Sequence, residues 1–202
     1  VGAAIAAKFL AAHTGNPTFA KETIYAYISD GGIQEEISQG AARIAAVLGL
    51  DNLIMFYDSN DIQLSTETAD VMNENTAAKY RALGWEVLEI NGNDTAEIRK
   101  AIETAKAVTG KPTLIIGKTI MGKGALRADG TSYEACINTH GAPLGGDAYI
   151  NTIKNLGGNP ESPFEIFPEV QKLYADRKEE LKQIVAARYA EEAEWAKANP
   201  EK

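Results

Sequence analysis

Residues 24–66 read IYAYISDGGIQEEISQGAARIAAVLGLDNLIMFYDSNDIQLST, and their pattern predicts the fold of the whole chain. An apolar run at 24–28 stops at the polar turn 29–32, and a second run at 53–57 stops at 58–60. A helical pattern lies between the two runs. Two buried strands joined by a helix form a parallel β-α-β unit, and ligands bind at the carboxyl ends of the strands in such sheets. The polar residues after the two strands are therefore candidate site residues.

The two predicted strand ends carry groups that suit a phosphate and a metal ion. Gly31 and Gly32 let backbone N–H groups approach a ligand, and they precede a helix N-terminus, which favours a phosphate. Asp30 offers a carboxylate and Asn60 an amide oxygen, which are hard ligands for Mg²⁺ or Ca²⁺. On residue types alone, Asp30 and Asn60 are explained equally well as ordinary turn residues that follow strands.

The rest of the chain continues this alternation of strands and helices. Strands are expected at 23–28, 53–57, 85–90 and 113–116. Helices are expected at 1–13, 34–48, within 68–83, after Asp94 or Thr95, at 146–156 and at 168–197. This order predicts the α/β class, a doubly wound parallel sheet with helices on both faces. The Gly-rich segment 119–145 is expected to be a functional or disordered loop.

The helix expected at 34–48 carries an apolar stripe at helical spacing. Its members are Ile37, Ala41, Ile44, Ala45 and Leu48. Such a stripe is expected to lie in the core, and a dimer contact is the alternative. The polar segment 59–66 is expected to be a loop.

Composition excludes several classes of protein. The chain has 202 residues, of which 45% are apolar and 24% charged, which is typical of one globular α/β domain. A formal charge of −8 argues against nonspecific nucleic-acid binding. Apolar runs are too short for a membrane span. The single cysteine, Cys136, cannot form an internal disulfide, so we expect a reducing, cytoplasmic location.

Four blocks of this sequence resemble transketolase. They are SDGGIQEEISQGA at 29–41, LGLDNLIMFYDSNDIQLST at 48–66, PTLIIGKTIMGKG at 112–124 and THGAPLG at 139–145. The first two include the pattern D-G-x-x-x-E and an Asn 30 positions after the Asp, which is similar to the thiamine-diphosphate motif. The resemblance extends over the whole chain. It implies that 1–165 form part of the diphosphate-binding domain and that 166–202 form a helix leading to a linker.

The resemblance implies a metal ion that bridges the protein and the cofactor. In the family, this metal takes the Asp side chain, the Asn side chain and one backbone carbonyl two residues beyond the Asn. Carried over to this chain, the ligands are Asp30, Asn60 and the carbonyl of Ile62. Two diphosphate oxygens and a water would complete an octahedron suited to Mg²⁺.

The resemblance also implies further contacts with thiamine diphosphate. Gly31 would approach the diphosphate, and Glu35 would lie close to the cofactor and to the partner subunit. Met121 would be an apolar wall for the thiazolium ring. His140 would lie by the diphosphate and the reacting substrate, as a catalytic group suited to proton transfer. The chain departs from the family at Ser29, where a Gly is usual.

A second departure, Glu36, places a negative charge near the anion site, where many relatives have Gly. Transketolase transfers a two-carbon ketol unit between sugar phosphates, and its active site forms between two subunits. The resemblance therefore implies a homodimeric transferase whose aminopyrimidine-binding domain is absent here. We expect a truncated fragment that is inactive alone.

Other interpretations remain open. A 1-deoxyxylulose-5-phosphate synthase-like enzyme would share the same cofactor. One subunit of a split transketolase, or a non-catalytic diphosphate-binding module, would share the site but lack activity alone. An unrelated α/β phosphate-binding domain would use Asp30 for Mg²⁺ without a preference for thiamine diphosphate.

Overall fold

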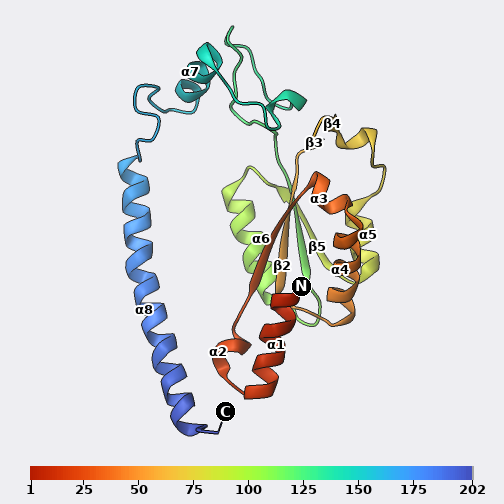
Figure 1. The fold of residues 1–202 in the computed structure, drawn as a ribbon, viewed down its shortest axis with the longest axis vertical. Coiled ribbons are helices and arrows are strands. Elements are labelled where there is room, and N and C mark those ends of the chain that lie inside the picture. The colour runs from red at the N-terminus through yellow and green to blue at the C-terminus, as the bar shows by residue number, and fades with distance from the viewer. Residues whose placement is uncertain (202) are drawn as a thin grey trace. The chain divides into compact units, whose positions relative to one another are not determined.

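A computed structural model describes residues 1–201, apart from the side chain of Pro17 (Figure 1). The chain divides into two units. The first comprises Val1 and Thr23–Pro160, and the second comprises Gly2–Glu22 and the residues from Glu161 onward. The first unit contains the predicted site, and each unit is described by itself.

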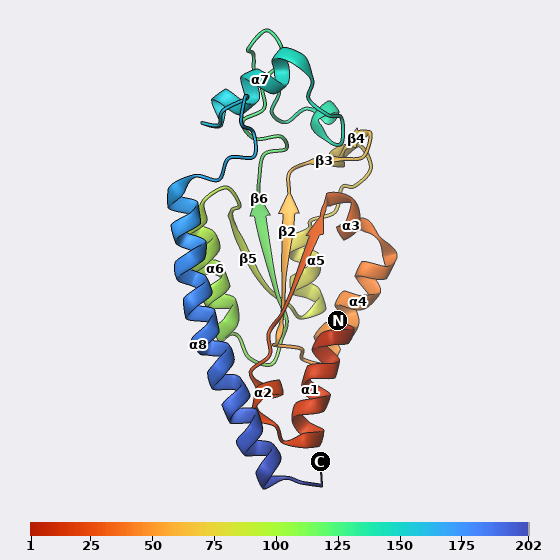
Figure 2. The ribbon, with the colours of Figure 1, turned by 60° about the vertical axis from the view of Figure 1, so that its left-hand side comes forward.

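The first unit is built on a four-stranded parallel sheet. Its strands are β1 (Ile24–Ser29), β2 (Leu53–Ser59), β5 (Glu86–Asn91) and β6 (Thr113–Lys118), in the spatial order β1-β2-β6-β5. Its helices are α3 (Asp30–Gln34), α4 (Glu36–Val47), α5 (Thr76–Leu83), α6 (Thr95–Ala107) and α7 (Gly146–Asn155). Helix α6 covers one face of the sheet, and α4 and α5 cover the other (Figures 1 and 2). The predicted α/β fold with a parallel sheet is confirmed.

Both faces of the sheet bury apolar side chains. On the α6 face, Ile54 and Ile115 pack with Ala101 and Ala105. Because successive side chains of a strand alternate between faces, Leu114 points to the opposite side and is fully buried there. On the α4 and α5 side, the indole N–H of Trp85 donates to the carbonyl of Ala42 at 2.9 Å. The sheet is thus a rigid support for the loops at its carboxyl edge.

The helix expected at 34–48 is confirmed as α4 over Glu36–Val47, but two details differ from the expectation. It is broken at Glu35, whose backbone is extended with φ −61° and ψ 134°, so that α3 and α4 are separate helices. Most of the predicted core stripe faces outward: Ile37 is 80% exposed, Ile44 52% and Leu48 51%. Of the predicted stripe, Ala45 is buried, and the other buried side chains of α4 are Gln39 and Ala42, which lie outside the stripe. The face of α4 that carries small side chains packs inward. The face that carries the large apolar side chains is exposed.

Other boundaries differ from the expectations by a few residues. The expected loop 59–66 contains two short antiparallel strands, β3 (Ile62–Gln63) and β4 (Thr66–Glu67), followed by a 3-10 turn, η1 (Thr68–Asp70). Helix α5 begins only at Thr76, after its N-cap Asn75. For α6 the N-cap is Asp94, which accepts from two backbone N–H groups of the first turn. The loop 119–145 contains one 3-10 turn, η2 (Ile137–Thr139).

The second unit is helical. It contains α1 (Gly2–Thr14), α2 (Pro17–Ala20) and the long helix α8 (Pro168–Ala198), which has no buried residue. An exposed ion pair between Lys21 and Glu191, at 2.7 Å, links the segment after α2 to α8. Among residues 1–201, no helix is long and apolar enough to cross a membrane.

The core of the first unit contains one polar atom whose removal we expect to be stabilising. Tyr80 on α5 is fully buried and packs edge-on against Trp85, with ring centroids 5.3 Å apart. Its hydroxyl has no hydrogen-bond partner among the described residues. An unpaired buried hydroxyl costs free energy, so Tyr80→Phe is expected to raise the free energy of unfolding by about 1 kcal/mol at neutral pH.

The pH dependence of the same variant provides a second check. Burial raises the pKa of Tyr80 from 10.0 to about 12. The unfolded chain therefore loses this proton first, and stability falls as the pH rises from 10 to 12. Urea unfolding of Tyr80→Phe should show a shallower fall in this window, whereas Tyr174→Phe, at an exposed tyrosine of α8, should match the native chain. A clear loss of stability in Tyr80→Phe at neutral pH would contradict this account.

Candidate functional site

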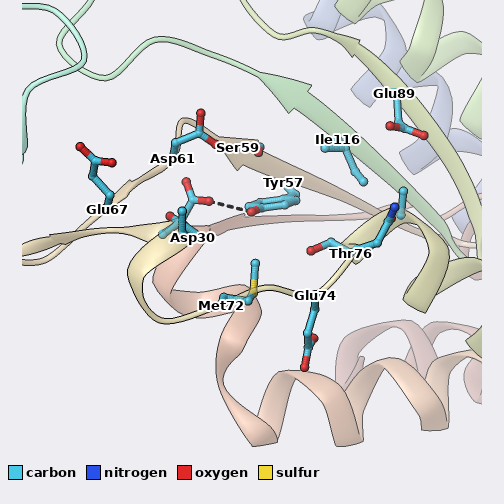
Figure 3. Close-up of a pocket in the computed structure, with 14 residues that line it drawn as sticks. Asp30, Tyr57, Ser59, Asp61, Glu67, Met72, Glu74, Thr76, Glu89 and Ile116 are labelled. Carbon is cyan, nitrogen blue, oxygen red and sulfur yellow. Dashed lines mark hydrogen bonds between the residues drawn. The ribbon is translucent and has the colours of Figure 1, made fainter.

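Asp30 lies at the carboxyl end of β1 and is held there by two hydrogen bonds. The residue is only 1% exposed. Its Oδ1 accepts a hydrogen bond from the hydroxyl of Tyr57 at 2.7 Å, and its Oδ2 accepts one from the backbone N–H of Asn60 at 2.9 Å. Figure 3 shows the Tyr57 hydroxyl pointing at this carboxylate. The two predicted side-chain ligands, Asp30 and Asn60, are therefore neighbours in space.

The turn after β2 is fixed by its own hydrogen bonds. The side-chain oxygen of Asn60 accepts from the backbone N–H of Ile62 at 3.1 Å, and both residues are buried. Between them, Asp61 has a φ of 67°, a left-handed conformation that Asp tolerates better than most residues. The carbonyl of Asp61 accepts from the N–H of Thr68 at 2.8 Å, and its carboxylate pairs with Lys118. The turn thus places Ile62 beside Asn60 in a defined conformation.

The donor set suits a hard cation. Each oxygen of the Asp30 carboxylate accepts one of the two hydrogen bonds described above, and an ionised carboxylate has about four acceptor positions. Capacity for a cation therefore remains. Among residues 1–201, no group of three or more His, Cys, Asp or Glu side chains is placed to hold a metal. A metal at Asp30 would depend on amide and carbonyl oxygens such as those of Asn60 and Ile62, which is the ligand chemistry of Mg²⁺ and Ca²⁺.

Gly31 and Glu35 line one open cavity. Its volume is about 360 Å³, and its other lining residues are Gln34, Glu36, Gln63 and Leu64. A side chain at Gly31 would meet nothing within 4 Å, so the space above this backbone is free. The amide of Gln34 donates to the carbonyl of Asp30 at 3.0 Å and to the side chain of Gln63 at 2.5 Å. These contacts join α3 to the β3 strand beside the cavity.

Met121 and His140 lie in the loop that follows β6. The start of this loop is fixed to the sheet edge, because the N–H of Thr119 donates to the carbonyl of Ser59 at 3.0 Å. The carbonyl of Met121 accepts from the N–H of Ala135 at 2.9 Å. The Nδ1 atom of His140 is buried and has no hydrogen-bond partner among the described residues. Their predicted contacts with a cofactor stay predictions.

Sequence reasoning missed Tyr57. It lies in the predicted strand, where an aromatic residue is ordinary, and only the pairing of β1 with β2 brings its hydroxyl to Asp30. Burial, and then the hydrogen bond to Asp30, raise the pKa of Tyr57 above its ordinary value. The phenol therefore stays protonated and remains a donor near neutral pH.

A second cavity, of about 460 Å³, adjoins Asp30 on the side of Tyr57 (Figure 3). Its lining includes Asp61 and the carboxylates of Glu67, Glu74 and Glu89. No lysine, arginine or histidine is among the residues that line it. Three of these carboxylates form ion pairs with residues outside the lining: Asp61 with Lys118, Glu74 with Lys79 and Glu89 with Arg81. The cavity at Gly31 is also lined by two glutamates, Glu35 and Glu36.

Comparison with known proteins identifies the family. The model of the family described as transketolase, thiamine diphosphate binding domain, matches residues 1–202. The chain belongs to the transketolase family. The matching domain binds thiamine diphosphate, which is the cofactor that the sequence resemblance implied.

Curated relatives agree with this assignment. A probable transketolase of Streptococcus pneumoniae is 41% identical over 207 residues, which cover 99% of this chain. Transketolase 1 of Escherichia coli is 38% identical over 204 residues and covers the whole chain. The chain spans 30% of the length of each of these two relatives. The region that this chain matches is therefore one part of each of these longer relatives.

Solved structures show the same fold. Transketolase from Leishmania mexicana has a TM-score of 0.89 and 30% identity, and the match covers 98% of this chain and 29% of the other. A transketolase of Pichia stipitis, in complex with sedoheptulose-7-phosphate, has a TM-score of 0.90 and 32% identity, with coverage of 99% and 29%. The fold described above is thus that of a transketolase domain.

Proposed function

We propose that this chain binds the diphosphate group of thiamine diphosphate through a divalent cation, Mg²⁺ or Ca²⁺. The ligands from the chain are Asp30, Asn60 and the carbonyl of Ile62. The observation that carries the proposal is the 2.9 Å hydrogen bond from the Asn60 N–H to the Asp30 carboxylate, which holds the ends of β1 and β2 together. Buried oxygens that keep acceptor capacity at a sheet edge suit a cation that bridges to phosphate.

Four further residues complete the proposed cofactor site. Gly31 offers free space over its backbone to a diphosphate oxygen, and Glu35 lines the same cavity. Met121 would face the thiazolium ring as an apolar wall. His140 would move a proton at the reacting substrate, a task for which histidine is suited near neutral pH.

The activity proposed for the whole protein is that of a transketolase. It would transfer a two-carbon ketol unit from a ketose phosphate to an aldose phosphate. When bound, thiamine diphosphate would supply an electron sink for the negative charge that develops on the transferred two-carbon unit. This chain's share would be to hold the metal and diphosphate and to move a proton at His140. The sugar-phosphate complex of the Pichia stipitis relative supports this substrate class.

A second subunit, in a homodimer of the full protein, is the partner we propose. The uncovered apolar face of α4 supports it: Ile37 is 80% exposed and Val47 81%, and this helix directly follows Glu35. Monomeric proteins rarely leave a contiguous apolar face of this kind in water. The aminopyrimidine-binding domain would come from the part of the relatives that this chain does not span. We also propose a cytoplasmic location, which the free cysteine, Cys136, supports.

Titration calorimetry tests the proposed function. Thiamine diphosphate is titrated into the purified chain with and without Mg²⁺, and then after addition of the aminopyrimidine-binding portion of a transketolase. Binding that requires Mg²⁺ in either arm supports the proposal, and absence of binding in both arms contradicts it. Equal competition by ATP would contradict a preference of this site for thiamine diphosphate over other phosphate compounds. Ketol transfer by the chain alone would refute its assignment as an inactive fragment.

A further inference from the structure

The carboxylate of Asp30 depends on protein donors for its orientation. The residue is only 1% exposed, so bulk water does not surround its oxygens. One oxygen accepts from the Tyr57 hydroxyl at 2.7 Å and the other from the Asn60 N–H at 2.9 Å. Two donors on different oxygens fix the plane of a carboxylate, because rotation about the Cβ–Cγ bond would lengthen both hydrogen bonds.

The Tyr57 donor is itself rigidly placed. Tyr57 is 3% exposed and lies on β2, an inner strand paired on one side with β1 and on the other with β6. In the register, Tyr57 is opposite Ile28 on β1, two residues before Asp30, and opposite Ile116 on β6. A side chain on an inner strand has little freedom to follow a carboxylate that moves. The Tyr57 hydroxyl is therefore a donor with a fixed position, and its hydrogen bond fixes the position of one carboxylate oxygen of Asp30.

We propose that Tyr57 is a positioning residue for the metal-binding carboxylate of Asp30. The inference rests on the proposed function above and extends it to a side chain outside the predicted ligand set. The Tyr57 hydroxyl orients Oδ1 so that the remaining lone pairs of the carboxylate face the cation beside Asn60. Hydrogen-bonded partners of metal ligands typically contribute about 10–100-fold to metal affinity.

The test uses the full 202-residue chain and Mn²⁺, an oxygen-preferring cation whose free form is measured by electron paramagnetic resonance. Titrations in the presence of thiamine diphosphate compare the native chain with Tyr57→Phe, Asp30→Ala and Tyr25→Phe. The control Tyr25 is a half-exposed tyrosine on β1. We expect Tyr57→Phe to weaken Mn²⁺ binding by about 10–100-fold, Asp30→Ala to abolish it, and Tyr25→Phe to leave it unchanged.

A second measurement needs no metal. Because the Asn60 N–H donates to the other oxygen of Asp30, its hydrogen exchange reports how firmly the carboxylate is held. Exchange at Asn60 should be faster in Tyr57→Phe, while the protection of β6 amides stays native, which separates lost positioning from general unfolding. A role for Tyr57 in packing alone would alter neither the Asn60 exchange nor the Mn²⁺ affinity of the folded variant.

The outcomes separate the two proposals. Native affinity in Tyr57→Phe, together with lost binding in Asp30→Ala, would overturn the role of Tyr57 and leave the proposed function intact. Tighter binding in Tyr57→Phe would also overturn it, because the hydroxyl would then compete with the metal. Native binding in Asp30→Ala, or no binding by the native chain even after addition of the aminopyrimidine-binding portion of a transketolase, would overturn the proposed metal site and this inference with it.

Discussion

Asp30→Ala is expected to abolish metal-dependent binding of thiamine diphosphate, a larger effect than the loss of about 10–100-fold that follows removal of a residue hydrogen-bonded to a metal ligand. The carboxylate is the one charged ligand in the proposed set, since Asn60 and Ile62 offer only neutral oxygens. Without it, a divalent cation loses both a direct bond and most of its electrostatic attraction. Titration calorimetry with Mg²⁺, on the chain alone or with the aminopyrimidine-binding portion added, measures the change.

The same substitution should also affect stability. The Tyr57 hydroxyl and the Asn60 N–H both donate to Asp30, so alanine leaves two buried donors unpaired. Each buried unpaired group costs about 1–3 kcal/mol, and relief of the buried charge offsets part of this sum. We therefore expect a loss of about 2 kcal/mol in the free energy of unfolding. Urea unfolding provides the measurement.

Two control variants separate charge from packing. Asp30→Asn keeps the volume and one acceptor oxygen, so it should lose less stability than alanine while binding remains strongly impaired. Asp147→Ala removes an exposed carboxylate in the first turn of α7 and should behave as the native chain in both assays. If Asp30→Ala still bound thiamine diphosphate in a metal-dependent way, the cation would have ligands other than Asp30.

Gly117→Ala is expected to destabilise the sheet by about 1–3 kcal/mol, the usual cost of overpacking a core. Gly117 is buried on β6, and an added Cβ would lie 2.3 Å from Cζ of Phe56 and 3.2 Å from Cα of Gly92. The aromatic ring blocks the methyl group on one side and the backbone after β5 on the other. The Phe56 ring or the β6 backbone must shift, because 2.3 Å is far shorter than van der Waals contact, and the backbone at Gly92 must give by a few tenths of an ångström.

Thermal and urea unfolding of three variants test this explanation. Gly40→Ala, a glycine of α4 with nothing within 4 Å of its added Cβ, should gain about 0.5–1 kcal/mol, as expected in a helix interior. Adding Phe56→Leu to Gly117→Ala should restore part of the lost stability, because the ring is the closest obstacle. A neutral effect of Gly117→Ala alone would contradict the close packing of β6 against Phe56.

The outward face of α4 illustrates why periodicity alone mispredicts burial. The stripe from Ile37 to Leu48 has the spacing of a core face, yet its large members are exposed, and the buried side chains of α4 are Ala45, from the stripe, with Gln39 and Ala42. Helical spacing is a local property that states which residues share a face. Which face meets the protein depends on neighbouring elements, here Trp85 and α5, and on the break at Glu35.

From its sequence alone, this protein is determined to be a parallel α/β domain with Asp30 and Asn60 at adjacent strand ends. Apolar runs bounded by polar turns are local signals that predict the strands. The spacing between the motif residues indicates the family. The tertiary structure alone decided the strand order β1-β2-β6-β5, the left-handed turn at Asp61, and the contact between Tyr57 and Asp30. The strand order and the Tyr57–Asp30 contact depend on pairing between residues 27 or more positions apart, such as Glu86 with Thr113 and Ile24 with Leu53, and no local pattern encodes this pairing.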